Sequence, residues 1–398
     1  MYHFFATFSA NSLGTVQSKR VNKYFHNLSQ KEVFSFNNKE FHAKICSHKS
    51  WGSPNYICFQ RGHLTFIGSA RLDNLDELIL DLGDGGVQEA SEIILALFEK
   101  YQEECLERLS GDFGFLIYDA EKNKVWCVKD QLGVRPLFYL QNEDFILFSS
   151  SLAAIRAYVG LENLSINKKY VAKELKNYPV DVEETFFNEI HRLKPAHYAK
   201  IGLGNSPIQE TRYWTFKPMD TTAFSNQKLV FDELRRLFNQ AIVNRLRNVK
   251  IAATQLSGGL DSSAITVLAS RILPKENLHT FSFVLNEKTR AYSEQGIDEQ
   301  VTQNSIRAYA NLIHENHHYS EGFYYQNTFE CYDKSDEIMG GYADSDSVWQ
   351  DSMYKQAAEF GVEVMFSGFP GDEGISNTGS RYFFEYFNNT FYSFSRDC

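Results

Sequence analysis

The stretch Gln255-Leu256-Ser257-Gly258-Gly259-Leu260-Asp261-Ser262-Ser263 lies between an apolar run and a strong helix pattern. The apolar residues 249–253 are typical of a buried strand, and residues 264–272 predict a helix that Pro274 closes. A glycine turn between a strand and a helix N-terminus suits phosphate, because glycine lets backbone N–H groups approach the oxygens and the helix dipole favours negative charge. The stretch therefore predicts a phosphate-binding loop on an α/β sheet.

The side chains of this loop narrow its chemistry. The loop lacks the lysine of the Walker motif G-x-x-x-x-G-K-[ST], so it is a different kind of phosphate loop. Ser262 and Ser263 supply hydroxyl donors. Asp261 adds a negative charge, which suits an anion site only if a cation bridges it to the phosphates, and Mg²⁺ is the usual one. An ordinary glycine turn is the plain alternative, and it leaves this combination of residues unexplained.

The motif Ser257-Gly258-Gly259-Leu260-Asp261-Ser262-Ser263 is similar to the signature of PP-loop ATP pyrophosphatases, and with its surroundings the chain resembles the asparagine synthetase family. The resemblance implies ATP as the bound nucleotide. A carboxylate would attack its α-phosphorus, pyrophosphate would leave, and an amine would take the acyl group from AMP. The implied ATP-binding residues of this loop are Leu256, Ser257, Gly258, Gly259, Leu260, Asp261, Ser262 and Ser263.

A second strand-like run leads into another glycine loop, Ser367-Gly368-Phe369-Pro370-Gly371-Asp372-Glu373. At the carboxyl ends of neighbouring parallel strands, the two loops would face one crevice. Asp261 and Asp372 are then candidates to share Mg²⁺, which would offset the charge of the leaving pyrophosphate. The resemblance implies that Ser367 and Gly368 contact ATP. The candidate catalytic residues are Asp261, Asp372 and Glu373.

Other segments of this half fit the same sheet. Residues 278–284 suit a second parallel strand, and the resemblance places Phe283 against adenine at its end. Residues 293–299 match a family segment that begins a helix, here predicted over 298–312. Residues 229–247 predict an amphipathic helix whose apolar stripe we expect in the core. We expect the histidines at 314, 317 and 318, between that helix and a strand, to be surface residues rather than metal ligands.

Short strand-like runs fill the chain up to about residue 205, with one clear helix over 89–101. Strands with few helices between them predict stacked antiparallel sheets. The predicted strands are 2–8, 56–60, 64–69, 113–119, 125–129, 137–140 and 145–149.

The same region resembles the class II glutamine amidotransferase domain, which implies an Ntn-type antiparallel β-sandwich with helices. It is the order and spacing of the matching stretches that carry this resemblance. The stretches are 109–115, 118–119, 129–139, 148–152 and 193–198.

The glutaminase residues of that family are absent. Its nucleophile is a cysteine exposed by removal of the first methionine, whereas Tyr2 stands here, and a phenol with a pKa near 10 is no substitute. The family's oxyanion pair Asn-Gly aligns with Ser69-Ala70, the following glutamate with Arg71, and the aspartate that holds the glutamine amino group with Ala90. The resemblance therefore predicts an inactive glutaminase with no nucleophile.

Two α/β domains follow from these patterns. We predict an amidotransferase-like domain over 1–205, a linker over 206–228 and a PP-loop domain with a parallel α/β sheet over 229–398. Relative to the family, the last domain is expected to be incomplete at its C-terminus. In the resembled family a lysine stabilises the adenylation transition state, and no residue of this chain can be assigned that role.

Composition limits the partners and the compartment. The 398 residues carry a net charge of −10 without a Lys/Arg cluster, which argues against nucleic acid. The six cysteines have no regular spacing, so neither a disulfide framework nor a metal site is expected. No apolar run is long enough for a membrane and no signal-peptide pattern stands at the N-terminus. We expect a cytoplasmic protein.

Phe369 is a departure that affects the substrate. Asparagine synthetases carry a glutamate there, β-lactam synthetases a tyrosine, and lasso-peptide macrolactam cyclases resemble this loop more closely. Phenylalanine accepts no proton, so another base acts or a different amine is used. Pro370 also removes one N–H from the loop.

The leading hypothesis is an asparagine synthase-like, ATP- and Mg²⁺-dependent carbon–nitrogen ligase that forms AMP and pyrophosphate from a small-molecule or peptide carboxylate. A macrolactam cyclase acting on a precursor peptide is the close alternative. The third hypothesis is an ATP-binding scaffold without catalysis, completed by a partner protein.

Overall fold

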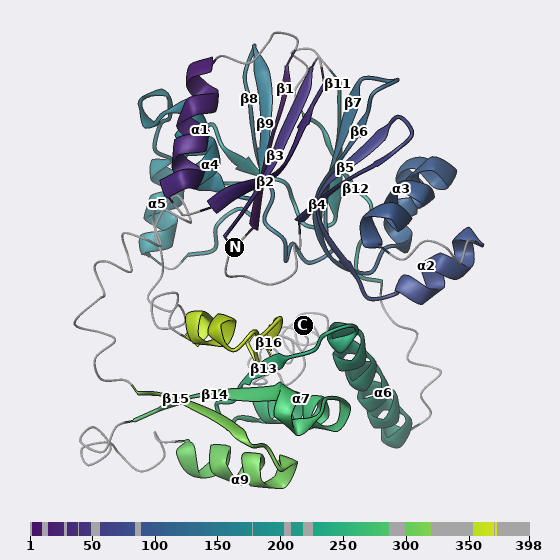
Figure 1. Cartoon of the computed structure of the whole chain (residues 1–398), viewed down its shortest axis with the longest axis vertical. Helices are drawn as coiled ribbons and strands as arrows, with labels where there is room; N and C mark the ends of the chain where they lie inside the picture. Colours follow the sequence, from purple (N-terminus) through teal and green to yellow (C-terminus); the bar gives the residue numbers. More distant parts are fainter. Residues whose placement is uncertain are drawn as a thin grey trace, which may run out of the picture. The chain divides into compact units, whose positions relative to one another are not determined.

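The chain forms two compact units, Met1–Ala223 with Phe329–Val348 and Phe224–Thr328 with Trp349–Cys398 (Figure 1). No helix in the part of the chain that is described has the length and apolar character needed to cross a membrane. The computed structural model describes residues 2–9, 15–27, 30–38, 40–48, 56–83, 89–176, 178–202, 208–217, 226–285, 299–319, 353–369 and 371.

The first unit contains two six-stranded sheets, in which all neighbouring strands are antiparallel. The stacked antiparallel sheets predicted from the sequence are confirmed. In order across the first sheet lie β10 (His191–Arg192), β8 (Phe138–Gln141), β9 (Phe145–Ser149), β1 (Tyr2–Ser9), β3 (Phe41–His48) and β2 (Gln30–Asn37). In order across the second lie β12 (Glu210–Arg212), β11 (His197–Gly202), β7 (Lys124–Lys129), β6 (Gly111–Asp119), β5 (Leu64–Leu72) and β4 (Tyr56–Arg61).

Side-chain alternation along β1 explains why both faces of its sheet are buried. Phe4, Ala6 and Phe8 pack into the core shared with the second sheet, together with residues such as Leu116 of β6. Phe5 points to the opposite face, where it packs against helical residues. A strand that buries both faces needs layers on either side, so the sandwich is covered by helices.

Helices cover the outer face of each sheet of the first unit (Figure 1). On the first sheet lie α1 (Thr15–Asn27) and α4 (Leu152–Val159), followed in the chain by η2 (Leu161–Asn163) and α5 (Lys168–Leu175). On the second lie α2 (Leu75–Leu82), α3 (Ala90–Tyr101) and the short η1 (Gln102–Arg108).

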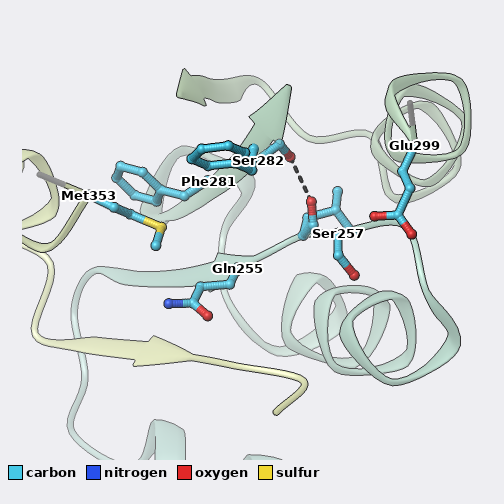
Figure 2. Close-up of a pocket in the computed structure, with 8 residues that line it drawn as sticks. Gln255, Ser257, Phe281, Ser282, Glu299 and Met353 are labelled. Atoms are coloured by element: carbon cyan, nitrogen blue, oxygen red, sulfur yellow. Dashed lines mark hydrogen bonds between the residues drawn. The ribbon is translucent and has the colours of Figure 1, made fainter. Parts of the chain in front are cut away.

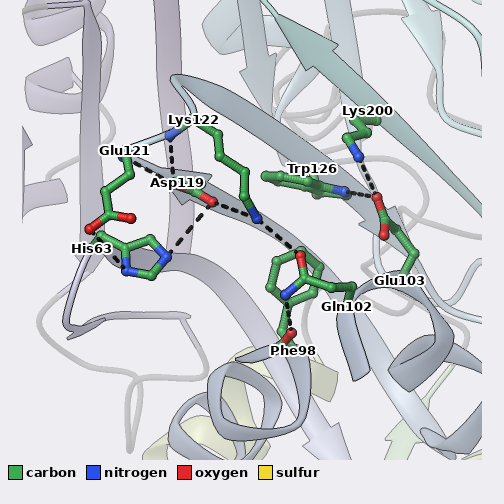
Figure 3. Close-up of polar contacts among 9 residues, drawn as sticks. All are labelled: His63, Phe98, Gln102, Glu103, Asp119, Glu121, Lys122, Trp126 and Lys200. Atoms are coloured by element: carbon green, nitrogen blue, oxygen red, sulfur yellow. Dashed lines mark hydrogen bonds and ion pairs between the residues drawn. The ribbon is translucent and has the colours of Figure 1, made fainter. Parts of the chain in front are cut away.

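Two carboxylates, the buried Asp119 and the partly buried Glu103, fix the ends of these layers (Figure 3). Asp119, fully buried at the end of β6, accepts the backbone N–H groups of Glu121 and Lys122 at 3.0 and 2.9 Å and closes the β6–β7 hairpin. The Glu103 carboxylate in η1 accepts hydrogen bonds from the Trp126 indole N–H of β7 and the Lys200 ammonium of β11, both at 2.8 Å. The short helix is thereby tied to two strands of the second sheet.

The second unit contains a four-stranded sheet in the order β15-β14-β13-β16, and every neighbouring pair is parallel. The predicted parallel α/β sheet is confirmed. Its strands are β13 (Ala252–Gln255), β14 (Leu278–Val284), β15 (His314–Tyr319) and β16 (Val364–Phe366). Its helices include α6 (Gln227–Leu246), α7 (Leu260–Ile272), η4 (Lys275–Asn277) and α9 (Gln300–Ala310).

The apolar stripe of α6 differs from expectation. Ile242 and Leu246, in its last turns, are buried with Ala252 of β13 and Ala269 of α7. In its first half, Leu229, Phe231, Leu234 and Leu237 are 43–57% exposed. The prediction that the whole stripe is core was therefore wrong, because in the described part of the chain only the C-terminal turns of α6 pack against the sheet and α7.

The histidines near residue 314 also differ from expectation, since 314, 317 and 318 lie within β15 rather than before it. His314 pairs with His279 of the adjacent strand, and their rings stack with centroids 4.3 Å apart. Burial, and then the neighbouring His314, lower the pKa of His279.

Candidate functional site

The glycine loop connects β13 to α7, as the sequence predicts. The Leu256 N–H donates to the Phe281 carbonyl at 2.8 Å, so the first loop residue still pairs with β14. Gly258 has φ +97°, a conformation that L side chains rarely adopt. Gly259 then caps α7, and its N–H donates to the Ser257 hydroxyl at 3.2 Å. The turn thus depends on glycine at 258.

The hydroxyl groups of the loop have different surroundings. The Ser257 and Ser262 oxygens lie 2.9 Å apart, and the Ser262 hydroxyl also donates to the Gly259 carbonyl at 3.2 Å. The Ser263 hydroxyl is buried and has no hydrogen-bond partner in the described part of the chain. Ser262 therefore stabilises the loop itself, whereas Ser263 keeps its hydrogen-bonding capacity.

The loop after β16 lies directly against the first loop. A Cβ atom added to Gly368 would lie 2.9 Å from the Ser262 backbone nitrogen, and one added to Gly371 would overlap the Asp261 carboxylate. The Gly371 N–H donates to the Gly368 carbonyl at 2.7 Å and closes a turn. The two glycine loops thus meet at the carboxyl ends of adjacent parallel strands.

Of the other predicted residues of this loop, the structure describes some and not others. The Phe369 N–H donates to the Ser367 hydroxyl at 3.1 Å, and the Phe369 side chain is 82% exposed. Asp372 and Glu373 lie outside the described residues, although Asp372 directly follows Gly371 in the chain. Their roles stay predictions.

A pocket of about 120 Å³ opens beside the glycine loop (Figure 2). Phe283, the predicted adenine contact, lines it, and the Phe281 ring and the Met353 thioether add apolar walls. Burial raises the pKa of the Glu299 carboxyl, which also faces this pocket. The full lining is Gln255, Leu256, Ser257, Phe281, Ser282, Phe283, Glu299 and Met353.

Several lining residues were missed from the sequence. Phe281 and Ser282 could have been found, because they precede Phe283 in a strand that was predicted correctly. Glu299 stands one residue before α9, a position that its helix pattern made visible. Met353 comes from a segment about ninety residues beyond the loop, and no local motif marks it.

The donor set fits a magnesium nucleotide. The loop offers backbone N–H groups, the Asp261 carboxylate and the buried Ser263 hydroxyl, which has no partner among the residues that the structure describes. The described residues contain no group of three or more His, Cys, Asp or Glu side chains arranged to hold a metal by themselves. A cation here would share Asp261 with phosphate oxygens, which is the usual arrangement for Mg²⁺.

In the first unit, the positions that carry glutaminase residues in the resembled family lie on regular elements. Tyr2 begins β1, Ser69 to Arg71 lie in β5, and Ala90 begins α3. Ser69 is 1% exposed and pairs with Gly114 of β6. The residue types at these positions supply no thiol, side-chain amide or carboxylate.

Comparison with known proteins supports both units. Residues 85–214 match the family described as glutamine amidotransferase domain, and residues 233–393 match the family described as asparagine synthase. The amidotransferase match begins beyond Tyr2 and Ser69.

Two curated relatives from Bacillus subtilis (strain 168) are similar to the chain. Asparagine synthetase (glutamine-hydrolyzing) 3 is 28% identical over 250 residues, covering 61% of this chain and 40% of the relative. Asparagine synthetase (glutamine-hydrolyzing) 2 is 28% identical over 207 residues, covering 50% of this chain and 27% of the relative. The chain therefore spans less than half the length of either relative.

Among solved structures, a glutamine phosphoribosylpyrophosphate amidotransferase from B. subtilis covers 54% of this chain and 50% of its own, at 14% identity and a TM-score of 0.36.

Proposed function

Because the chain belongs to the asparagine synthase family, with a glutamine amidotransferase domain ahead of its synthetase domain, we propose that it is an ATP-dependent carbon–nitrogen ligase. The substrate carboxylate is adenylylated, pyrophosphate is released, and an amine receives the acyl group from AMP. The residues of the second unit serve to bind the nucleotide and to hold its phosphates for this displacement.

The observation that carries this proposal is the contact between the two glycine loops. Gly368 approaches the Ser262 backbone and Gly371 approaches the Asp261 carboxylate so closely that neither position has room for a Cβ atom. Two loops that meet at the carboxyl ends of adjacent parallel strands form the usual ligand crevice of an open α/β sheet. A polyphosphate in that crevice would be contacted from both loops.

The nucleotide is assigned to the loop and its neighbouring pocket. Residues 256–263 surround the phosphates with backbone and hydroxyl donors, Ser367 and Gly368 contact ATP from the second loop, and Phe283 lies against adenine. Asp261, with Asp372, would hold Mg²⁺, which would supply charge neutralisation for the departing pyrophosphate. Glu373 is a further candidate catalytic residue.

A macrolactam-forming activity on a precursor peptide is the second candidate, and Phe369 favours it. Its side chain is 82% exposed on the second loop, next to the proposed site. An exposed aromatic ring offers apolar contact area to a peptide, whereas a small polar amino acid would gain little from it. Phenylalanine also accepts no proton, so the amine must lose its proton to another group.

We further propose that the first unit no longer hydrolyses glutamine. A phenol at position 2 is protonated near neutral pH and is a poor nucleophile compared with a thiol. Ser69-Ala70, Arg71 and Ala90 stand where the resembled family has its oxyanion pair, a glutamate and an aspartate. The amine would then come from solution or from a peptide.

Pyrophosphate release and AMP formation test the proposed activity. The purified chain is incubated with MgATP and either aspartate plus ammonium, or synthetic peptides that carry a free N-terminal amine and an internal aspartate or glutamate. AMP formed only with aspartate supports a small-molecule ligase, and AMP with a mass loss of one water from a peptide supports macrolactam formation. MgATP binding without AMP in either reaction would contradict a ligase and favour a nucleotide-binding scaffold.

A further inference from the structure

Two backbone carbonyls of the glycine loop are held from β14 and α9. The Ser282 hydroxyl donates to the Leu256 carbonyl at 2.8 Å (Figure 2). The Gln303 side-chain amide donates to the Ser257 carbonyl at 3.2 Å and to the Phe283 carbonyl at the same distance. Consecutive peptide groups of the loop are thus each anchored by a buried side chain.

Because the peptide group is planar, a contact that fixes a carbonyl also fixes the direction of the next N–H group in the loop. In a trans peptide the C=O of one residue and the N–H of the next point in opposite directions. Holding the Leu256 carbonyl toward Ser282 therefore turns the Ser257 N–H away from β14. Holding the Ser257 carbonyl toward Gln303 likewise turns the Gly258 N–H away from α9. Among the described residues, neither N–H has a hydrogen-bond acceptor.

The orientations of both anchoring side chains are determined by their partners. Gln303 is 1% exposed, and because both of its partners are carbonyl acceptors, its NH₂ group must face them. Arg307 is 5% exposed and donates to the Ser282 oxygen at 3.3 Å, which leaves the Ser282 hydrogen free to point at the Leu256 carbonyl. Arg307 is held in turn by Glu315 and Asn304.

We infer that Gln303 and Ser282 are positioning residues that hold the Ser257 and Gly258 amides toward the phosphates of the bound nucleotide, an inference that rests on the proposed ATP site. Neither side chain touches the phosphates in this arrangement. Losing either anchor frees a peptide group to rotate, and a rotated group would present a carbonyl oxygen to an anion. Phosphate affinity should then fall while the apolar pocket keeps its shape.

Calorimetry with two ligands tests this inference. Gln303→Met keeps the length of the side chain and removes its donors, and Ser282→Ala removes the other anchor. We expect each change to weaken MgATP binding about tenfold, equivalent to about 1.4 kcal/mol, and to change the affinity for adenosine less than about twofold. Gln240→Met is the matched control, because Gln240 is exposed on α6 and its side-chain amide donates to Asn244, one turn further along the same helix.

The outcomes separate the inference from the proposed function. Wild-type protein that binds neither MgATP nor pyrophosphate would overturn both. Wild-type binding of MgATP with an unchanged affinity in folded Gln303→Met and Ser282→Ala overturns the inference alone, as does an equal loss of MgATP and adenosine binding.

A measurement on the wild-type chain covers the case in which neither variant folds. With ¹⁵N-labelled serine and glycine, magnesium pyrophosphate should shift the amide resonances of Ser257 and Gly258 more than those of Ser270 and Gly202. Unshifted amides at 257 and 258 in protein that binds pyrophosphate would overturn the inference.

Discussion

Asp261 is the only carboxylate between residues 255 and 263, and it stands in the first turn of α7. A negative side chain at a phosphate site repels the ligand unless a cation lies between them. The proposed ligase therefore needs Asp261 as a magnesium ligand, and that need can be measured separately from folding.

Replacing Asp261 by Asn should weaken MgATP binding by about tenfold or more, because the amide no longer neutralises the cation. In the presence of EDTA, the substitution should leave ATP affinity unchanged or increase it, since the wild-type carboxylate then only repels the phosphates. Calorimetry with and without Mg²⁺ measures both effects. Asp232→Asn, at a half-exposed position on α6, serves as control. An equal loss of affinity in both conditions would contradict the metal role.

Gly368→Ala should separate the two glycine loops. The new Cβ atom would lie 2.9 Å from the Ser262 nitrogen, and backbone shifts of this kind cost about 1–3 kcal/mol. We expect AMP formation to fall at least tenfold. The matched control is Gly202→Ala, where no atom lies within 4 Å of the added Cβ. Full activity of Gly368→Ala would show that contact between the loops is dispensable.

A functional residue could be predicted from the sequence when its partners lie close to it along the chain, and not when they lie far away. The glycine loop was visible because one local segment supplies its turn, its donors and its charge. Gln303 and Met353 could not be predicted from the sequence, because their roles arise only when α9 and a distant segment pack beside β14. Position-specific chemistry without a local motif cannot be read from one sequence.

At the scale of elements, strands that bury both faces were predicted best. Residues 113–118 and 125–128 carry no charged side chain, and β6 and β7 appear there as an antiparallel pair. In contrast, α1, β2 and β3 were not predicted. Their sequences mix charged, polar and aromatic residues, and this mixture weakens the local pattern. The exposed first half of α6 shows the opposite error, an apolar stripe without a covering layer in the described residues.

The contact of η1 with the second sheet makes the first unit sensitive to acid. Burial raises the pKa of Glu103, but hydrogen bonds from Lys200 and Trp126 outweigh it and hold the pKa below its ordinary 4.5. A lowered pKa in the folded state stabilises the fold above pH 4.5, and this contribution is lost as the pH falls through the lowered value.

Glu103→Gln should therefore destabilise the first unit at pH 7 by about 1–2 kcal/mol, and the difference from wild type should shrink below pH 4.5. Thermal unfolding between pH 3 and pH 7 checks this, with the exposed neighbour Glu104 changed to Gln as control. If the variant stays less stable than the wild type by the same amount down to pH 3, the charge of Glu103 contributes nothing to stability.

For the molecule as a whole, we expect the proposed ligase chemistry in the second unit and no catalysis in the first. Purified protein should release no ammonia from glutamine above the uncatalysed rate, because Tyr2 supplies no thiolate. The B. subtilis asparagine synthetase 3, named as glutamine-hydrolyzing, is the positive control. Ammonia release by this chain would contradict an inactive first unit. AMP formation should accordingly depend on added ammonium or peptide amine and not on glutamine.

The position of β1 within its sheet has a consequence for biosynthesis. β1 lies between β3 and β9, and the Phe4 N–H donates to the hydroxyl of Ser150, 146 residues later. Ribosomes add about 5–20 residues per second, so the apolar N-terminal strand of a nascent chain waits roughly 7–30 s for its second neighbour. During that interval Phe4, Phe5 and Phe8 are available to chaperones, and slowing translation before codon 150 would prolong their exposure.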